Sequence, residues 1–451
     1  MVKYQAYAEY KDSGVQWIGN IPKDWKFLRG KWKFKSLKEV NRDLQCMDRL
    51  ALTMNGVIER SIDSDEGLQP AEFSGYQIFE KDDLVFKLID LENFKTSRVG
   101  LVFKRGIMSP AYIRLKPFVG TDSKFFYYFY FDLYLRGVYN QIGGQGVRSA
   151  LNATDLLEIE VCIPSLSEQK LIANFLDHET TKIDHLIEKQ QQLIELLKEK
   201  RQAVISHAVT KGLDPNVPMK DSGVEWLGEV PEHWAIPQIG YHAEVTKLTG
   251  FEYTNLWAPN DDGEIIALRG FNIQERYLDL NKTERISQKL SYKLIRSKLY
   301  KNDLVLPCTG TLGNAALIDK DNTYHINQNI AKVTYDKKLF FPEFCLYWMT
   351  SLPFRQMIDF NNTSGMQPVL LIGDIRKLPI VLPPLSEQVE VVSYLNIKTQ
   401  KFDSLIKKAE SAISLMQERR TALISAAVTG KIDVRNWQAP NVAEADTEFS
   451  A

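Results

Sequence analysis

Apolar side chains recur every seven residues in two long segments of the chain. The first row occupies positions 176, 183, 190, 197 and 204, and the second occupies 395, 402, 409, 416 and 423, with only the glutamine at 190 breaking the pattern. A heptad period held this long predicts two long helices that pack as in a coiled coil. The residues expected at this packing surface are Leu176, Ile183, Leu186, Leu197, Val204, Leu395, Phe402, Leu405, Met416 and Leu423.

The two helical segments are copies of one sequence. Each begins with Pro-x-Leu-Ser-Glu-Gln, at Pro164 and Pro383, and each ends near Ala-Val-Thr, at 208–210 and 427–429. Every position from 164 to 211 aligns with the position 219 residues later, and 22 of these 48 pairs are identical. The chain therefore contains an internal duplication, and the two copies are expected to pack on each other.

Capping residues mark both ends of each predicted helix. The Ser-Glu pair of the opening motif offers an N-cap hydroxyl and a carboxylate suited to the helix dipole. Pro384 replaces Ser165, which removes a Ser-x-x-Glu capping box from the second helix, so the second cap is expected at Ser386. Gly212 and Gly430 stand where a C-terminal glycine cap is expected.

A shorter repeated motif, Trp-x-Gly-x-x-Pro-x-x-Trp, lies before each long variable block. It runs from Trp17 to Trp25 and returns 209 residues later, from Trp226 to Trp234. Glycine and proline at these positions favour a tight turn. We expect a turn held by two buried indoles in each copy, in preference to a ligand-binding role.

Two blocks between the repeats, 26–163 and 235–382, differ much more in sequence. Their short apolar runs predict strands at 83–86, 99–103 and 111–115, and at 264–268, 303–306, 315–318 and 330–335. Longer aromatic runs at 125–135 and 344–349 predict one buried helix in each block. Asp-Leu-Val recurs at Asp83 and Asp303, so the blocks are expected to share one mixed fold with diverged surfaces.

The repeats and blocks divide the chain into seven segments. They are a lead-in at 1–25, a first block at 26–163, a helix at 164–212, a linker with the second lead-in at 213–234, a second block at 235–382, a helix at 383–431, and a flexible acidic tail at 432–451.

Charge is unevenly distributed along a nearly neutral chain. The formal net charge is −1, but residues 81–120 carry eight Lys and Arg against four acids, and residues 269–301 carry nine against three. Such local basic patches are compatible with nucleic-acid contact, although runs of charge are more often solvated faces.

Loops rich in glycine and amides accompany these basic runs. Gln, Asn and Arg are the side chains that hydrogen-bond adenine and guanine edges in pairs. The loops at 141–148 and 361–367 precede the last strand of each block, and two further clusters lie at 309–314 and 327–329. The candidate DNA-binding residues are Lys104, Arg105, Gln141, Gln145, Arg148, Arg269, Thr309, Asn314, Gln328, Asn329 and Gln367.

Motifs for catalysis, metal binding and membrane insertion are missing. The sequence holds no phosphate-binding loop, no His-Glu-x-x-His and no Asn-Pro-Pro-aromatic methyltransferase motif. The four cysteines lie far apart, without Cys-x-x-Cys or metal spacing. No apolar run approaches the length of a membrane span, and no signal pattern opens the chain. We therefore expect a cytoplasmic protein without catalytic or metal sites.

Taken together, the repeats resemble the specificity subunit of type I restriction-modification systems, over residues 4–435. The resemblance implies a mixed α/β fold with two target-recognition domains separated by two long antiparallel helices. Each domain would read one half of a bipartite, gapped site in double-stranded DNA. The subunit would bind no cofactor itself, because S-adenosylmethionine, ATP and magnesium would belong to partner subunits.

The same resemblance implies protein partners. These are two copies of a methyltransferase subunit and a restriction subunit that translocates DNA. Small and apolar residues near the helix ends, within 201–209 and 420–428, are the candidate docking surface: Ile205, Ala208, Ile424 and Ala427. The alternative is that these residues pack on the lead-in segments around Trp17 and Trp226.

Other functions remain open on the sequence alone. The chain could serve a type II-like methylating nuclease in the same way. Less favoured are a coiled-coil scaffold whose two domains bind peptide or sugar, and an enzyme of nucleic-acid metabolism whose catalytic motif is not recognisable. The bases of the two half-sites cannot be read from the sequence.

Overall fold

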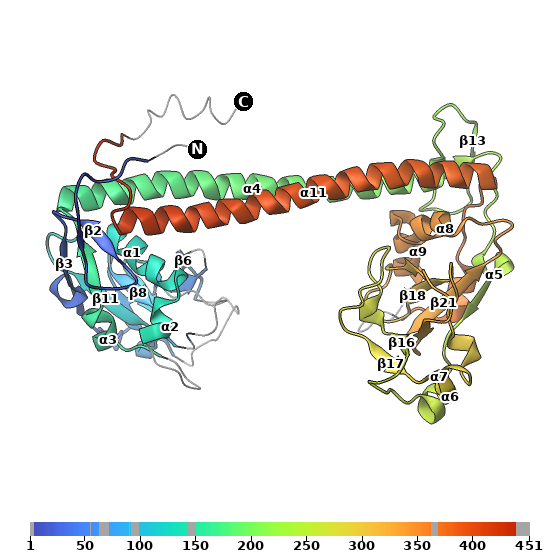
Figure 1. Ribbon diagram of the computed structural model, residues 1–451, viewed down its shortest axis with the longest axis horizontal. Coiled ribbons are helices and arrows are strands. Elements are labelled where there is room, and N and C mark those ends of the chain that lie inside the picture. Colours follow the sequence, from blue (N-terminus) through green and yellow to red (C-terminus); the bar gives the residue numbers. More distant parts are fainter. Residues whose placement is uncertain are drawn as a thin grey trace. The chain divides into compact units, whose positions relative to one another are not determined.

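Two compact units make up the computed structural model of the chain (Figure 1). Unit 1 comprises Met1–Gln190 and Ser411–Ala451, and unit 2 comprises Gln191–Glu410. The structure describes residues 4–54, 56–62, 72–89, 91, 99–142, 150–361 and 369–438. The boundaries between the units fall inside the two long helices, so each unit contains one variable block and part of both helices.

Two long helices, α4 (Leu166–Lys211) and α11 (Leu385–Val428), confirm the prediction from the heptad pattern. Unit 1 holds the start of α4 and the end of α11, and unit 2 holds the other two ends, so the helices are antiparallel (Figure 1). In unit 1 the Arg420 guanidinium donates to Asp184 at 2.8 and 3.2 Å. In unit 2 Arg201 donates to Asp403 at 2.6 Å. The duplicated sequence thus forms the same ion pair twice.

Most of the predicted packing residues of the helices are covered. Leu176, Ile183, Leu395 and Leu423 are buried, and Leu197, Val204, Phe402 and Met416 are half-buried. The prediction is wrong for Leu186 and Leu405, which are 40% and 39% exposed. The isoleucine that follows each of them, Ile187 or Ile406, is covered instead, so the seam continues four positions after Ile183 and Phe402 and leaves both leucines on its flank. Ile194, Ile406 and Ala409 are buried too, although they were not among the predicted packing residues; position 409 belongs to the second heptad row.

The helix caps differ in part from expectation. The Ser165 hydroxyl accepts from the Glu168 amide at 3.3 Å, so the first cap is Ser165. The predicted cap at Ser386 is wrong, because α11 already begins at Leu385 and Ser386 lies inside it. Gly212 and Gly430 adopt left-handed φ values of 76° and 73°, which confirms both C-terminal glycine caps.

The opening motif of each helix anchors the helix to its unit. The buried side chain of Gln169 donates to the Pro164 carbonyl at 2.9 Å and accepts from the Asp122 amide at 3.0 Å. Gln388 does the same in unit 2, with the Pro383 carbonyl at 2.9 Å and the Phe341 amide at 2.8 Å. The glutamine of Ser-Glu-Gln therefore joins each helix to its variable block.

Unit 1 is built around a four-stranded antiparallel sheet with the order β4-β11-β8-β9. Its strands are β4 (Phe34–Ser36), β8 (Leu84–Phe86), β9 (Val99–Leu101) and β11 (Ile113–Pro117). Four pairs flank it, namely β1 (Tyr10–Asp12) with β2 (Asn20–Pro22), β3 (Lys26–Arg29) with β12 (Glu160–Ile163), β5 (Leu50–Thr53) with β6 (Gly56–Glu59), and β7 (Gln77–Phe79) with β10 (Gly106–Met108). The helices are α1 (Ser123–Leu135), α2 (Val138–Ile142) and α3 (Ala153–Glu158), with 3₁₀ turns at Gly30–Trp32 and Phe73–Gly75.

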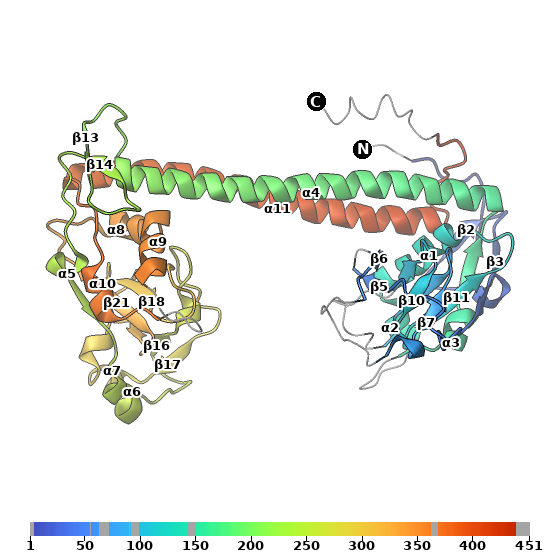
Figure 2. The same cartoon turned by 180° about the vertical axis from the view of Figure 1, so that it is seen from behind.

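Unit 2 repeats this sheet with the order β15-β21-β18-β19. Figure 2 labels its two central strands, β21 and β18. The strands are β15 (Ala243–Thr246), β18 (Leu304–Pro307), β19 (Ala316–Leu317) and β21 (Ile330–Tyr335). A second sheet joins β16 (Ile265–Leu268), β17 (Glu284–Ile286) and β20 (Tyr324–Ile326), and β13 (Met219–Asp221) pairs with β14 (Glu229–Pro231). The helices are α5 (Ile239–His242), α6 (Gly250–Leu256), α7 (Gln288–Ser291), α8 (Pro342–Met349), α9 (Leu352–Asn361) and α10 (Ile372–Lys377), with 3₁₀ turns η3 (Gly270–Asn272) and η4 (Ile295–Ser297).

The shared sheet confirms that the two blocks have one mixed α/β fold. Leu84 pairs with Leu115 in unit 1, and Leu304 pairs with Val333 at the matching place in unit 2. The strands predicted at these places are present, and so are the buried helices α1 and α8. Short apolar runs and aromatic runs were therefore sufficient to locate the core of both blocks.

The lead-in motif is held by one buried indole in each copy, where two were predicted. Trp25 and Trp234 are 1% and 0% exposed. Trp17 and Trp226 are only half-buried. Trp17 lies under the Arg136 guanidinium, 5.6 Å from its ring centre, and Trp226 packs on Phe360 at 4.6 Å between ring centres.

The first residues of the predicted flexible tail are packed on unit 1. The Asp433 amide donates to the Gln5 carbonyl at 2.8 Å, and the Arg435 guanidinium lies 4.9 Å from the centre of the Tyr7 ring. Trp437 packs edge-on against Phe175 at 5.6 Å. The prediction of a flexible tail is wrong for 432–438, because Ile432 and Val434 belong to the core, and 439–451 lie outside the described residues.

The four candidate docking residues are interior, and their assignment to a partner is wrong. Ile205 and Ala208 are 0% and 1% exposed and share a cluster with Leu227, Val230 and Trp234. Ile424 and Ala427 are both 0% exposed in the cluster around Trp25. Side chains that the fold already covers offer no surface to a second protein. The alternative of packing on the lead-in segments is what the structure shows.

No helix among the described residues is long and apolar enough to cross a bilayer.

Gly430 tests how tightly the lead-in packs on α11. A Cβ atom there would overlap the Pro22 ring and lie 3.2 Å from Trp25, at a φ that disfavours L side chains. We expect Gly430→Ala to lower the free energy of unfolding by about 2–4 kcal/mol in urea denaturation. Gly14→Ala is the matched control, since Gly14 has a similar φ of 75° with nothing within 4 Å, and it should cost about 1 kcal/mol. Equal losses would contradict this account of the packing.

His325 predicts an acid-sensitive unit 2. The ring is fully buried, and this burial, with the nearby charges of Lys298 and Lys332, lowers the pKa of His325 to about 4. The unfolded chain binds the proton near pH 6.5, so the stability held above that pH is lost as pH falls toward 4. The loss should reach about 3 kcal/mol. Urea denaturation from pH 7 to 4 measures it, and His325→Gln, although less stable throughout, should show a shallower decline. A parallel decline in the variant would contradict the assignment.

Candidate nucleic-acid interface

Several loops of unit 2 meet beyond the end of strand β18. The Cys308 amide donates to the Asn329 carbonyl at 2.7 Å, and the Leu370 amide donates to the Cys308 carbonyl at 2.8 Å. Thr309 forms an isolated β-bridge with Val369. The turn η3 also approaches, because a Cβ on Gly270 would lie 4.0 Å from the Thr309 carbonyl oxygen. We call the residues 269–272, 308–314, 327–329 and 369–370 the loop cluster.

The loop cluster brings together most of the candidate residues of unit 2. Arg269 and Asn329 are exposed, and Thr309, Asn314 and Gln328 are half-buried. Asn314 is occupied, since its Nδ2 donates to the Ile273 carbonyl at 3.1 Å. Arg269 is held by a 3.1 Å hydrogen bond from Nη1 to Glu284, and Gln367 lies outside the described residues. Gln328 and Asn329 are therefore the side chains best placed to contact a partner.

An arginine network that the sequence did not suggest supports this cluster. Glu275 follows η3 and accepts from Arg201 of α4 and from Arg355 of α9, each at 3.1 Å. Arg201 also donates to Asp403 of α11. Glu275 and both arginines are partly buried, so the network fixes the loop after η3 against the long helices of unit 2. The duplicated Arg and Asp of the helices were visible in the sequence, but the carboxylate of Glu275 was not connected to them.

Unit 1 has the corresponding loops at the same place. Ile89 forms a bridge with Ala150, and the Leu151 amide donates to the Leu88 carbonyl at 3.0 Å, just as Leu370 donates to Cys308 in unit 2. Gln141 is exposed on α2. The predicted readers Gln145 and Arg148 fall in 143–149, outside the described residues.

Lys104 and Arg105 lie at the other end of the sheet of unit 1. They follow β9, where the Val102 amide donates to the Asp83 carbonyl before β8 begins, whereas Ile89 comes after β8 ends. Lys104 lies 2.9 Å from Glu59, which raises the pKa of the lysine, and Arg105 lies 3.4 Å from Glu80. The chain turns both to the opposite edge of the sheet from these loops and pairs both with carboxylates, so they do not lie with the loop residues, and their contact with DNA stays a prediction.

Burial further reduces the exposed positive charge of the basic run 81–120 of unit 1. Arg114 is fully buried and forms an ion pair with Asp83, which is 1% exposed. Lys332 occupies the matching strand position in unit 2 and donates to the Lys298 carbonyl at 3.2 Å. A buried cation is thus part of the shared fold, and its charge is not available to a ligand.

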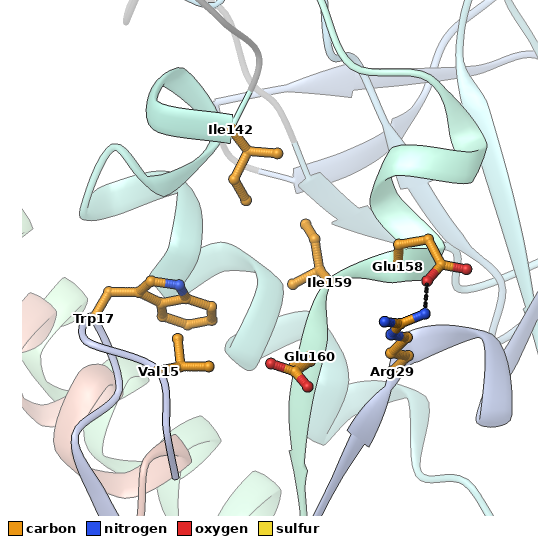
Figure 3. Close-up of a pocket in the computed structure, with 7 residues that line it drawn as sticks. All are labelled: Val15, Trp17, Arg29, Ile142, Glu158, Ile159 and Glu160. Atoms are coloured by element: carbon orange, nitrogen blue, oxygen red, sulfur yellow. Dashed lines mark hydrogen bonds and ion pairs between the residues drawn. The ribbon is translucent and has the colours of Figure 1, made fainter.

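A surface hollow of unit 1 lies between the lead-in, α2 and the strand pair β3–β12 (Figure 3). Its lining residues are Val15, Trp17, Arg29, Ile142, Glu158, Ile159 and Glu160. Arg29 donates to Glu158 at 2.6 Å, and the Lys31 ammonium, which also bonds to Glu158, lowers the pKa of this carboxyl. The hollow therefore presents a paired carboxylate and a second acid beside an indole, which does not suit a phosphate.

The thiols are buried and unreactive. Cys46, Cys162, Cys308 and Cys345 are free and buried. Burial raises the pKa of Cys162 to about 12 and that of Cys308 to about 11, so neither is a thiolate at neutral pH. Within the described ranges, no group of three or more His, Cys, Asp or Glu side chains is placed to hold a metal ion.

Known proteins share this arrangement. The family model for the type I restriction modification DNA specificity domain matches residues 30–196 and 273–414. The specificity subunit of the type I restriction enzyme EcoBI from Escherichia coli is 24% identical, over 71% of this chain and 68% of the relative. The EcoKI specificity subunit from Escherichia coli K12 is 23% identical, over 74% of this chain and 69% of the relative.

Solved structures support the fold. A chain from a structure concerned with assembly and conformational transition of the type I system has a TM-score of 0.65 at 12% identity, covering 91% of this chain and 99% of that one. The HsdS subunit from Thermoanaerobacter tengcongensis has a TM-score of 0.50 at 12% identity, covering 91% and 98%. With two matched regions that cover more than half of its length, this chain belongs to the type I restriction modification DNA specificity family.

Proposed function

We propose that this chain is the non-catalytic specificity subunit of a type I restriction-modification complex, and that it reads a bipartite, gapped site in double-stranded DNA. Each unit reads one half-site. The observation that carries the proposal is one recognition fold used twice with different loops at the same edge of the sheet. Methyl transfer, ATP hydrolysis and DNA cleavage, with S-adenosylmethionine, ATP and magnesium, then belong to partner subunits in the cytoplasm.

Duplication within one chain explains why the two halves of the site can differ. A homodimer has two identical reading surfaces and therefore favours a palindrome. Here Thr309 of unit 2 stands where Ile89 stands in unit 1, at the same β-bridge. A polar reader and an apolar residue at equivalent positions contact different base edges, so the two units are free to recognise unrelated sequences.

Exposed leucines on the long helices support a role of these helices in binding partner subunits. In unit 1, Leu186 and Leu415 are 40% and 64% exposed, close to the Asp184–Arg420 ion pair. In unit 2, their duplicated partners Leu405 and Leu196 are 39% and 63% exposed, close to the Arg201–Asp403 ion pair. Large apolar side chains repeated on a solvent-facing helix are typical of a surface that a partner covers. We infer one methyltransferase subunit at each leucine pair.

Removing one leucine pair should remove one partner. Leu186→Asp with Leu415→Asp should leave a complex with a single methyltransferase subunit, because a charge in an apolar interface is costly to bury. Native mass spectrometry of the reconstituted complex counts the subunits. The control is Glu199→Ser with Glu418→Ser, which changes one exposed, duplicated residue on each long helix outside the leucine pair and should leave two subunits bound. Two subunits on the leucine variant, with unchanged helicity, would place the docking surface elsewhere.

The proposed readers of unit 2 can be separated from its structural amides. Asn329→Ala should relax base preference at one half-site only and cost about 1–3 kcal/mol in binding, with the stability of the chain unchanged. Asn314→Ala should instead lower stability by about 1 kcal/mol, because it removes the hydrogen bond to Ile273. Mapping of modified bases reports the half-sites, and urea denaturation reports stability. Relaxation of both half-sites by Asn329→Ala, or of neither, would contradict the assignment. Gln145, Arg148 and Gln367 stay predicted readers.

A further inference from the structure

Among the described residues, five cations that form no ion pair lie in one short segment of unit 2. The segment 288–301 contains α7 and η4, and its only charged residues are Lys289, Lys293, Arg296, Lys298 and Lys301. Four of them are exposed and Lys298 is half-buried. We call these five side chains, with Tyr292 and Tyr300, the basic surface.

The cations of the basic surface outnumber the acids beside them. In the part of the chain that the structure describes, none of the five cations forms an ion pair within 4.0 Å, whereas Arg269 of the same basic run is paired with Glu284. Two carboxylates lie beside the segment and bond to its backbone. Asp321 accepts from the Lys301 backbone amide at 2.7 Å, and Glu264 accepts from the Gln288 amide at 3.0 Å. The surface therefore keeps most of its positive charge.

Exposed aromatic rings accompany the cations. Tyr292 and Tyr300 are 65% and 44% exposed, and the Lys298 ammonium lies 5.4 and 6.0 Å from their ring centres. Tyrosine hydroxyls and lysine ammonium groups both donate to phosphate oxygens. The combination is the one expected for a surface that follows a sugar-phosphate backbone.

The segment is held in place by the buried ring of His325. Its Nε2 hydrogen-bonds to the Ser291 hydroxyl at 2.8 Å, at the end of α7, and its Nδ1 hydrogen-bonds to the Ser297 hydroxyl at 2.9 Å, at the end of η4. Both serines are fully buried. One side chain thus fixes both turns that carry the cations, so the charges are presented from a defined backbone.

The basic surface lies away from the loop cluster. Lys301 comes before the start of β18, whereas Thr309 follows its end, and the four residues of this strand span about 13 Å. The basic surface is therefore a second place of contact and does not extend the reading loops.

Unit 1 lacks this charge. Asp83 and Asp303 are equivalent, so the matching stretch before β8 is 68–81, where the only charged residues are Glu72, Glu80 and Lys81. A surface for the duplicated partner subunits would be expected in both units. Restriction to unit 2 instead points to a ligand that the two units meet differently.

We propose that the basic surface binds backbone phosphates of duplex DNA beside the half-site read by unit 2, independently of base sequence. The inference rests on the proposed function, since it takes the DNA bound by the loop cluster as its ligand. Phosphate contacts fix a protein on the duplex without reading bases, and each contact adds about 0.9 to the salt dependence of binding.

The test uses the full chain assembled with its methyltransferase subunits. The duplex carries the site at which this complex modifies DNA. In the variant Lys289→Gln, Lys293→Gln, Arg296→Gln, the slope of log Kd against log salt should decrease by about 2–3. Affinity should fall equally for specific and unrelated duplexes, so sequence preference stays unchanged. The matched control is Lys337→Gln, Lys338→Gln, Lys377→Gln, which removes three exposed charges from unit 2 outside the basic surface and should leave the slope unchanged.

A second variant separates charge from folding. Lys289→Arg with Lys293→Arg keeps the charge and should keep the wild-type slope. A glutamine variant whose slope equals that of the control overturns the proposal, and so does loss of a protein subunit at an unchanged slope, which would indicate an acidic protein partner. If the wild-type complex shows no preference for the modified duplex, the proposed function itself fails. If the wild-type complex prefers that duplex and only the slope prediction fails, the proposed phosphate contact is wrong and the proposed function stands.

Discussion

The structure depends on two buried glutamines at the starts of the long helices. Gln169 and Gln388 are 1% and 0% exposed, and each bonds both to the proline before its helix and to a backbone amide of its variable block. A buried amide without these partners would cost about 1–3 kcal/mol, so the geometry around it is closely constrained. The adjacent glutamates bind the lead-in segments, through Tyr7 in unit 1 and through Trp234 in unit 2. One tripeptide therefore connects helix, block and lead-in.

The sequence predicted the elements well, because their signals are local or repeated. Heptad spacing gave the long helices, glycines gave their ends, and apolar runs gave the central strands. The errors concern residues whose burial depends on a segment distant in the sequence. Leu186 and Ile205 are both apolar residues on the same helix, yet the first is exposed and the second is buried under the lead-in. Periodicity shows which residues share a helical face, but it does not show what lies against that face.

The candidate site was less predictable, because charge along the sequence differs from charge on a surface. Two runs looked similarly basic. In unit 1, Arg114 is interior and Lys104 and Arg105 are paired with acids from other strands. In unit 2, Lys289 of α7 and Arg296 of η4 form no ion pair with any described residue. Packing of β6 against β9, which belong to different sheets, brings Glu59 to Lys104, and nothing in the spacing of these two residues indicates it.

Duplication separates the parts that must stay alike from those that are free to differ. The Arg–Asp pairs and the Ser-Glu-Gln motifs recur in both units because they hold the same fold together, and the exposed leucines recur at duplicated positions of the helices. The bridge residues Ile89 and Thr309 differ, and the cations before β18 occur only in unit 2. An asymmetric ligand explains this division. A gapped DNA site has two unrelated halves, so each half can select its own loops and its own phosphate contacts, whereas the helices, which under the proposed function meet the same kind of partner twice, keep 22 of 48 positions identical.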